Sequence, residues 1–190
     1  REDLSTINKE AQRTAQVVRN LLTFARKHEP TKQSVDINSI IQKVLEMRAY
    51  EHKVNNVQVN KDFAPDLPEV LADGFQLQQV FFNIIINAEY FMIEAHGRGT
   101  LTITTERLDD AVRVSLTDDG PGISQENLRR IFDPFFTTKE VGKGTGLGLS
   151  ICHGIVTAHG GRIYAEGELG KGATFIVDLP IQIVAQEGVK

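Results

Sequence analysis

The first 29 residues have the spacing of a single amphipathic helix. Neither glycine nor proline occurs before Pro30, and apolar or small side chains recur every three or four positions, at Leu4, Ile7, Ala11, Ala15, Val18, Leu22 and Ala25. The pattern predicts a long helix that ends at Pro30. Because such a helix has little of its own domain to pack on, the pattern favours a bundle or a dimer over a lone helix folded onto the domain. The helix has no start signal, so we expect the sequence to be part of a longer protein.

The remaining residues alternate between strand-like and helix-like patterns. Alternating or short apolar runs predict strands at 35–37, 56–63, 69–72, 100–108, 111–116, 162–168 and 173–179. A three-to-four-residue spacing predicts helices at about 38–51, 75–95 and 147–159, the first of them capped by Asn38 or Ser39. This order predicts an α+β fold with a layer of helices on a mixed, mainly antiparallel sheet. We therefore divide the chain into a helix at 1–30 and a domain at 31–190.

Composition narrows the class of protein. The chain has 190 residues and a formal charge of −4, and no run approaches the ~18 apolar residues of a membrane span. We expect neither membrane contact nor a cleaved leader in this sequence, and the acidic balance argues against nucleic-acid binding by charge neutralisation. The lone Cys152 excludes a disulfide framework and a cysteine-based zinc site. Of the 16 glycines, ten lie between Gly142 and Gly172, which indicates a special backbone geometry there.

Two asparagines lie one turn apart in the apolar helix predicted at 75–95. Asn83 and Asn87 are four residues apart, so their side chains lie on one helical face. An amide oxygen can bind Mg²⁺ without adding charge, and an amide nitrogen can donate to a phosphate. The alternative is a pair of buried amides that are satisfied by neighbouring backbone groups.

An acidic residue followed by two glycines comes directly after the strand predicted at 111–116. In the run from Asp118 to Ile123, Gly120 and Gly122 allow the backbone to approach a flat ligand closely. The carboxylate of Asp118 can accept a hydrogen bond from an exocyclic amine such as that of adenine. The alternative is an acidic turn between two elements, which is a common feature.

Alternating glycines precede and open the helix predicted at 147–159. The run from Gly142 to Ser150 leaves backbone N–H groups able to point at an anion, which the helix dipole also favours. It does not match a P-loop, and a loop rather than a strand precedes it, which argues against a dinucleotide-binding fold. Residues 129–145 carry four basic and two acidic side chains, a net charge of +2 that suits a polyphosphate. The phenylalanines of 131–139 indicate either a lid anchored at one end or an ordinary aromatic-anchored loop.

In their order and spacing, these motifs resemble the catalytic and ATP-binding domain of two-component sensor histidine kinases. That domain is a two-layer α/β sandwich, the Bergerat ATP-binding fold, and belongs to the GHKL superfamily with gyrase-type ATPases, the large heat-shock chaperone and mismatch-repair ATPases. The runs IFDPFFTTK and GKGTGLGLSI are especially similar to those of nitrogen-regulator and PAS-linked kinases. Residues 10–26 resemble the second helix of the dimerisation hairpin that precedes such domains.

The resemblance implies a site for ATP and Mg²⁺. Asn87 would bind the metal, Asp118 would recognise the adenine amine, and Lys139 would lie near the phosphates at the start of an ATP lid. Asn83, Asn87 and Lys139 would form the catalytic set. The implied nucleotide-binding residues are Asn83, Asn87, Tyr90, Asp118, Gly120, Gly122, Ile123, Phe132, Lys139, Lys143, Gly144, Thr145, Gly146, Leu147, Gly148, Leu149 and Thr174.

Two departures from the family pattern affect this expectation. Tyr90 stands three residues after Asn87, where many histidine kinases carry Lys or Arg. Either Lys139 or Lys143 would then supply the missing charge, or Tyr90 would stack or hydrogen-bond there. The histidines of the chain, none of which has the sequence context of a phosphoacceptor, are His28, His52, His96, His153 and His159. We therefore expect this sequence to bind ATP without phosphorylating itself.

One position separates transfer of phosphate to a protein from hydrolysis of ATP. Hydrolysing members of the superfamily place a Glu four residues before the metal-binding Asn, as the base for water, and here that position is Asn83. Glu89 lies about 200° around the helix from Asn87 and so points elsewhere. The site is therefore expected to hold ATP for transfer to a histidine.

The resemblance implies a cytoplasmic module of two-component signalling, whether or not the parent protein is anchored in a membrane. It would present the γ-phosphate to an acceptor His outside this sequence, for relay to an Asp of a response regulator receiver domain. The N-terminal helix would form a homodimer when the full hairpin is present, with Arg13, Gln16 and Arg19 as candidate contacts of the regulator. Two alternatives remain open, namely a related serine kinase of the same superfamily and a non-catalytic nucleotide-sensing dimerisation module.

Overall fold

The computed structural model describes residues 31–181. The elements in chain order are β1 (Gln33–Val35), α2 (Ile37–Val54), β2 (Val57–Phe63), β3 (Val70–Ala72), α3 (Gly74–His96), β4 (Gly99–Arg107), β5 (Ala111–Asp118), α4 (Gln125–Leu128), α5 (Gly148–Ala158), β6 (Arg162–Gly167) and β7 (Ala173–Pro180). The helix predicted at 1–30, and the dimerisation and regulator contacts assigned to it, lie outside the described residues.

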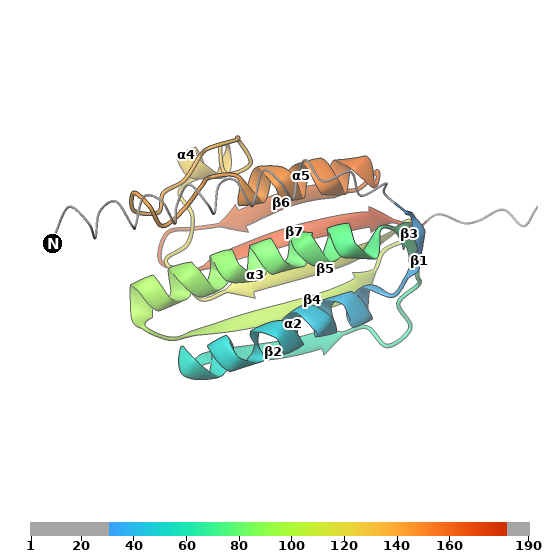
Figure 1. The fold of residues 1–190 in the computed structure, drawn as a ribbon, viewed down its shortest axis with the longest axis horizontal. Coiled ribbons are helices and arrows are strands. Elements are labelled where there is room, and N and C mark those ends of the chain that lie inside the picture. The colour runs from blue at the N-terminus through green and yellow to red at the C-terminus, as the bar shows by residue number, and fades with distance from the viewer. Residues whose placement is uncertain (1–30, 182–190) are drawn as a thin grey trace, which may run out of the picture.

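Helices and strands form two layers (Figure 1). Strands β2, β4, β5, β7 and β6 form, in this spatial order, a five-stranded sheet, and β1 pairs with β3 in a separate two-stranded sheet. The β2–β4 pair is parallel and the other pairs are antiparallel, as predicted for a mixed, mainly antiparallel sheet. Helices α2, α3 and α5 lie together on one face of the larger sheet (Figure 1), which confirms the predicted two-layer α+β fold.

The core lies between the helical layer and the sheet. Alternate strand residues point into it, as in β4, where Leu101 and Ile103 are fully buried while Thr102 and Thr104 are only partly buried on the other face. Helix α3 lies between α2 and α5 (Figure 1) and packs on both. This central place explains why α3 is apolar around much of its circumference. Neither α3 nor any other helix of residues 31–181 is long and apolar enough to cross a membrane.

The start of α2 differs from the prediction. Asp36, not Asn38 or Ser39, caps this helix, because its carboxylate accepts hydrogen bonds from the Ser39 backbone N–H at 3.2 Å and from the Ser39 hydroxyl at 2.8 Å. The strand predicted at 35–37 ends at Val35 instead, and the helix continues to Val54. Ile37 is buried in the core, so its apolar character does not distinguish a strand end from a helix start.

Asp73 joins three parts of the fold at the start of α3. Its carboxylate caps the helix by accepting from the N–H groups of Phe75 and Gln76, both at 3.0 Å, and it also accepts from the Thr31 N–H at 3.2 Å. Its own N–H donates to Nε2 of His159, which follows α5, at 2.9 Å. The first described residues and the adjoining ends of α3 and α5 are therefore fastened together at one point.

Candidate functional site

A cavity of about 640 Å³ lies between the second half of α3, the loop after residue 131 and the start of α5. Its volume suits a small-molecule ligand. The residues predicted to bind nucleotide that line it are Asn83, Asn87, Asp118, Gly122, Ile123, Lys139, Lys143, Gly144, Thr145, Gly146, Gly148 and Leu149. Among its other lining residues, the larger apolar side chains are those of Phe82, Ile86, Phe91, Ile131, Phe136, Leu169 and Phe175.

The amide of Asn87 and the ammonium of Lys139 meet in this cavity. Lys139 Nζ donates to Asn87 Oδ1 at 2.8 Å. Burial lowers the pKa of Lys139 to about 8, although the carboxylate of Glu94 acts in the opposite direction. A positive charge therefore lies against the amide oxygen that the sequence motif assigns to a metal ion.

Tyr90 supports this ammonium from outside the cavity lining. Lys139 Nζ lies 4.2 Å from the centroid of the Tyr90 ring and 5.4 Å from that of the Phe91 ring, within the range of cation–π attraction. The Tyr90 hydroxyl donates to Glu94 at 2.8 Å. Tyr90, at the position where the family pattern has a basic residue, thus stabilises the ammonium of Lys139 by a cation–π contact.

Asn83 also lines the cavity, but its amide takes part in the packing of α3 against α5. Its Nδ2 donates to the Gly148 carbonyl at 3.4 Å and lies 3.7 Å from Cys152 Sγ. Cys152 is fully buried, and burial raises the pKa of its thiol to about 12. The amide nitrogen of Asn83 therefore has its hydrogen-bond partners in the first turns of α5, as in the alternative given for a buried amide. Asn83 nevertheless lines the cavity.

Asp118 lines the same cavity from the point where β5 ends. Burial raises the pKa of Asp118 above its ordinary value, although hydrogen bonds from the backbone of Gly120 and Ala173 act in the opposite direction. The bond from the Gly120 N–H to Asp118 Oδ1 measures 2.9 Å. A buried carboxylate held in this way can accept a hydrogen bond from an amine that enters the cavity.

Two glycines allow the chain to close around the end of β5. Gly122 and Gly172 have φ angles of 75° and 79°. A Cβ at Gly122 would lie 2.0 Å from the carbonyl oxygen of Glu168, and a Cβ at Gly172 would lie 2.0 Å from that of Asp118. Neither position accepts another residue without a shift of the backbone. The glycines therefore bring two segments of the chain into direct contact behind Asp118.

The start of α5 presents backbone N–H groups to the cavity. Gly148 and Leu149, in its first turn, line the cavity, and Leu147 at the cap position offers no side-chain hydrogen bond. The starts of α2, α3 and α4, in contrast, are all capped by side chains. First-turn N–H groups without a side-chain cap are suited to bind an anion.

The loop predicted as a lid is joined at its two ends. The Phe135 N–H donates to the Gly146 carbonyl at 2.9 Å, and both residues have positive φ angles, 67° and 68°. A Cβ at Gly146 would lie 2.3 Å from the carbonyl carbon of Phe135, so this closure requires glycine. We name residues 135–146 the lid loop. It carries Lys139 and Lys143 to the cavity, with Lys143 Nζ 2.8 Å from Glu140.

Five predicted nucleotide-binding residues do not line the cavity, namely Tyr90, Gly120, Phe132, Leu147 and Thr174. The Phe132 ring lies 5.9 Å from that of His153, where it anchors the chain before the lid loop on α5. The Thr174 hydroxyl is hydrogen-bonded to that of Thr117 at 3.0 Å on the open face of the sheet. Side chains alternate along β7, so its neighbours Ala173 and Phe175 face the cavity instead.

Other residues of the lining were not among the predicted nucleotide-binding residues. Glu94 lies seven residues after Asn87, so continuing the spacing of Asn83 and Asn87 along α3 would have found it. Asn127 comes from the four-residue α4, and Thr137 and Thr138 come from the lid loop, and neither segment has a periodic pattern. Their place in the cavity depends on the fold of the whole loop.

The donor groups fit a metal ion that is held mainly by a nucleotide. Within residues 31–181, no group of three or more His, Cys, Asp or Glu side chains is arranged to hold a metal. Mg²⁺ at phosphates needs only one or two protein oxygens, and Asn87 Oδ1 already accepts a cationic donor. Asn87 would hold the metal, and Lys139 and the N–H groups of Gly148 and Leu149 would contact phosphate oxygens.

Comparison with known proteins places the chain in a family. The chain matches the family described as "Histidine kinase-, DNA gyrase B-, and HSP90-like ATPase" over residues 72–183. It is 37% identical over 180 residues to the sensor histidine kinase ZraS of Escherichia coli (strain K12). The aligned region covers 94% of this chain and 37% of ZraS. The chain therefore spans little more than a third of the length of this relative.

Solved structures show the same fold. The catalytic domain of histidine kinase ThkA is 34% identical, with a TM-score of 0.67 over 78% of this chain and 95% of that domain. Full-length ShkA in complex with AMPPNP gives a TM-score of 0.78 and 30% identity over 94% of this chain and 38% of ShkA. ThkA in complex with the response regulator protein TrrA gives a TM-score of 0.76 and 30% identity over 96% of this chain and 51% of that chain.

Proposed function

Because the chain belongs to the histidine kinase-, DNA gyrase B- and HSP90-like ATPase family, we propose that its domain at 31–190 binds Mg·ATP and donates the γ-phosphoryl group within a sensor histidine kinase. One observation carries the proposal. Asn87 Oδ1, the Lys139 ammonium and the uncapped start of α5 meet in one cavity, which the buried Asp118 also lines. These are the groups that a triphosphate with its cation, and an adenine amine, require.

The nucleotide would lie along the cavity with its adenine at Asp118 and its phosphates at Asn87. The complex of the relative ShkA with AMPPNP supports nucleotide binding at this fold. Mg²⁺, when bound, supplies neutralisation of charge on the phosphate oxygens. Lys139 and the N–H groups at Gly148 would hold the γ-phosphoryl group in place and stabilise its developing charge, and the lid loop would limit access of water.

Transfer to a protein, and not hydrolysis, fits the groups around Asn87. Asn83 stands one turn before Asn87, and an amide cannot take a proton from water. Glu89 is 4% exposed, forms an ion pair with Arg48 and is hydrogen-bonded to His52 on the far side of α3, so its carboxylate is not directed at the cavity. The arrangement therefore supports a site that waits for an external nucleophile.

The acceptor histidine would come from outside the described residues. Within residues 31–181, His52 and His159 are buried and hydrogen-bonded, to Glu89 and to the Asp73 N–H respectively. Residues 1–30 would form the second helix of a dimerisation hairpin and bring an acceptor helix to the cavity in a homodimer. The ThkA–TrrA complex supports a response regulator as the next phosphoryl acceptor, in the cytoplasm where ATP is available.

Nucleotide binding by the chain tests the proposal first. We expect Asn87→Ala to weaken binding of Mg·AMPPNP by about tenfold or more, because losing a ligand should cost at least as much as losing an outer-shell partner. Isothermal titration with Mg²⁺ and with EDTA measures the effect. Asn60→Ala is the matched control, since Asn60 is exposed on β2 and does not line the cavity.

Phosphoryl transfer tests the second step in the full-length protein. With labelled ATP, we expect an acid-labile, base-stable phosphohistidine that is lost in Asn87→Ala and retained in Asn60→Ala. Tight nucleotide binding without transfer to any histidine of the full-length protein would contradict the kinase function and favour a nucleotide-sensing module.

A further inference from the structure

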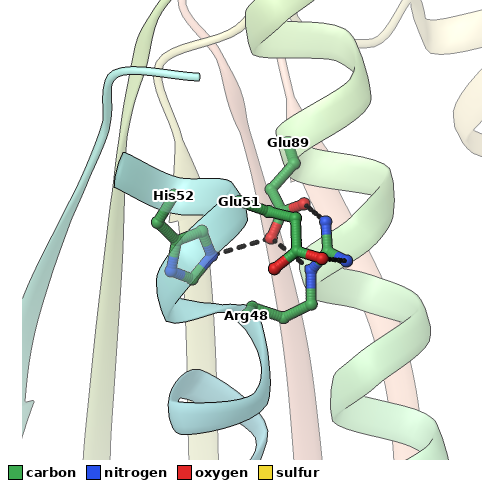
Figure 2. Close-up of polar contacts among 4 residues, drawn as sticks. All are labelled: Arg48, Glu51, His52 and Glu89. Carbon is green, nitrogen blue, oxygen red and sulfur yellow. Dashed lines mark hydrogen bonds and ion pairs between the residues drawn. The ribbon is translucent and has the colours of Figure 1, made fainter. Parts of the chain in front are cut away.

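A buried carboxylate joins α3 to α2 on the side away from the cavity. Glu89 on α3 is 4% exposed and His52 on α2 is 7% exposed. Figure 2 shows the side chains of Arg48 and His52 converging on the Glu89 carboxylate from α2. Arg48 Nε lies 3.2 Å from Oε1, its terminal nitrogen contacts Oε2, and His52 Nε2 lies 2.7 Å from Oε1. Glu51 holds the Arg48 guanidinium from the other side at 3.3 Å (Figure 2).

An apolar contact could give the same stability as this cluster, so stability does not by itself account for a carboxylate here. Moving charges out of water is expensive, and a well-packed apolar cluster of similar volume is often at least as stable as a buried ion pair. All other side chains that α3 buries are apolar. A carboxylate with two partners differs from an apolar contact because it permits one arrangement only, in which its oxygens meet specific donors. The cluster therefore fixes how α3 is placed against α2.

The placement of α3 decides where Asn87 lies. Glu89 is two residues after Asn87, about 200° around the helix, so the two side chains lie on opposite sides of α3. With a radius of about 5–6 Å, a rotation of α3 by about 20° would move the outer atoms of a side chain by about 2 Å. Arg48 also lies 6.0 Å from the centroid of Phe82, which lines the cavity next to Asn83. A change at the cluster is thus passed to the cavity by one rigid element.

We propose that Glu89, held by Arg48 and His52, is a positioning residue that sets the rotation of α3 and thereby places Asn87 Oδ1 for the metal ion. The inference rests on the proposed role of Asn87 in holding Mg²⁺. It adds that α2, which contributes no residue to the cavity lining, determines how much Mg²⁺ strengthens nucleotide binding. Displacements of this order can change the function of a site about 100-fold.

A second ionic cluster provides a matched control. Asp178 on β7 is 7% exposed and lies between Arg113, whose Nε is 2.7 Å from Oδ1, and Arg162, whose NH2 nitrogen is 2.9 Å from Oδ2. It lies three residues along β7 from Phe175, the nearest cavity-lining residue of this strand, about 10 Å away in an extended strand. Asp178→Asn therefore removes a buried carboxylate charge like that of Glu89, and we expect a similar loss of stability. The partners of Asp178 lie on β5 and β6, not on α3.

The test compares the affinity for AMPPNP in Mg²⁺ with that in EDTA, together with the melting temperature. We expect Glu89→Gln to reduce the gain from Mg²⁺ by about tenfold or more, whereas Asp178→Asn lowers the melting temperature and leaves this gain unchanged. Arg48→Lys keeps a positive charge without the two-pronged contact, and we expect an intermediate loss. If Glu89→Gln does not fold, the comparison of Arg48→Lys with Asp178→Asn decides the test.

Three outcomes would contradict the inference or the role of Asn87 on which it rests. If Glu89→Gln or Arg48→Lys shows the wild-type gain from Mg²⁺ while the melting temperature falls as in Asp178→Asn, the cluster is structural only and the inference is wrong. If the wild-type chain itself binds AMPPNP equally in Mg²⁺ and in EDTA, the proposed metal role of Asn87 fails instead. Parallel losses in Glu89→Gln and in Asp178→Asn would also refute a specific effect of Glu89.

Discussion

Lys139 shows how one side chain connects a loop to a helix. Its ammonium contacts Asn87 Oδ1 and the rings of Tyr90 and Phe91, and it thereby joins the lid loop to α3. This charge is buried, which lowers the pKa of Lys139 to about 8. The group that would contact phosphate therefore changes its protonation close to neutral pH.

The pH dependence of nucleotide binding follows from this pKa. Lys139 is charged below about pH 8 and becomes neutral above it, so we expect the affinity for Mg·nucleotide to fall as the pH rises through this value. In Lys139→Arg the guanidinium stays charged over the same range, and the fall should be absent. Titrations of ATPγS at several pH values measure both curves, and ionisation of the ligand cancels between them. Identical curves for the two proteins would contradict a role of Lys139 charge.

Single residues could be predicted from the sequence wherever a motif fixed them. Asn87, Asp118 and Lys139 were placed by their spacing and by the resemblance, and all three line the cavity. Thr174 was placed on the wrong side, because the motif gives its position in the chain and not the direction in which β7 turns its side chains. The polar contacts of Glu89 were not predicted, since they depend on how α2 lies against α3.

At the scale of elements, α3 is defined by its two ends. Asp73 caps its start and Gly97, with a φ of 67°, ends it. The Asp73 carboxylate also receives the Thr31 N–H, and its own N–H reaches His159 after α5. The start of α3 is thus the point at which the first described residues contact both helices of the cavity.

Removing this cap should therefore cost more than removing an exposed one. We expect Asp73→Ala to lower the free energy of unfolding by about 1–2 kcal/mol, and Asp73→Asn, which keeps an acceptor, to cost less than half of that. Asp36→Ala, at the exposed cap of α2, should cost about 0.5–1 kcal/mol. Urea unfolding measures all three. Equal losses in Asp73→Ala and Asp36→Ala would show that the contact of the Asp73 carboxylate to the Thr31 N–H adds nothing, since the bond from the Asp73 backbone N–H to His159 is kept in both variants.

Periodic elements were predicted well, whereas the pairing of strands that are distant in the sequence was not. The long α3 and the alternating strands β4 and β5 have local patterns that give their bounds within two residues. The parallel pairing of β2 with β4 and the separation of β1–β3 from the main sheet depend on contacts between distant residues. The four-residue α4 is too short for any periodicity to indicate it.

The charge distribution of the whole molecule determines its response to acid. Burial is the largest single effect on Glu89 and on Asp178, and it raises the pKa of both carboxyl groups. Hydrogen bonds from His52 and Arg48 to Glu89, and from Arg113 and Arg162 to Asp178, outweigh it together with the nearby positive charges, so both pKa values are lowered. A carboxyl group with a lowered pKa stabilises the fold above its unfolded pKa, and this stabilisation is lost as the pH falls through the folded pKa.

Acid titration of stability tests this distribution. We expect the free energy of unfolding to fall below about pH 4.5, the ordinary value for Glu89, and further below about 3.8, that for Asp178. Glu89→Gln and Asp178→Asn should be less stable at neutral pH but lose less on acidification. Asp118→Asn is the opposite case, since a raised pKa destabilises the ionised form, so this variant should gain relative stability as the pH rises. An unchanged acid slope in Glu89→Gln would contradict its ionised state.

The burial of Cys152 makes the molecule a ready substrate for distance measurements by fluorescence. It is the only cysteine of the chain, it is fully buried between α3 and α5, and its thiol is protonated at any pH used for coupling. Maleimide dyes would therefore react with cysteines introduced at the surface and leave the native one untouched. Suitable positions are Val141, 85% exposed in the lid loop, and Thr102, on the open face of the sheet. Dyes coupled to the variant Val141→Cys, Thr102→Cys would report the position of the lid loop relative to the sheet. No native residue of the core is replaced in this variant.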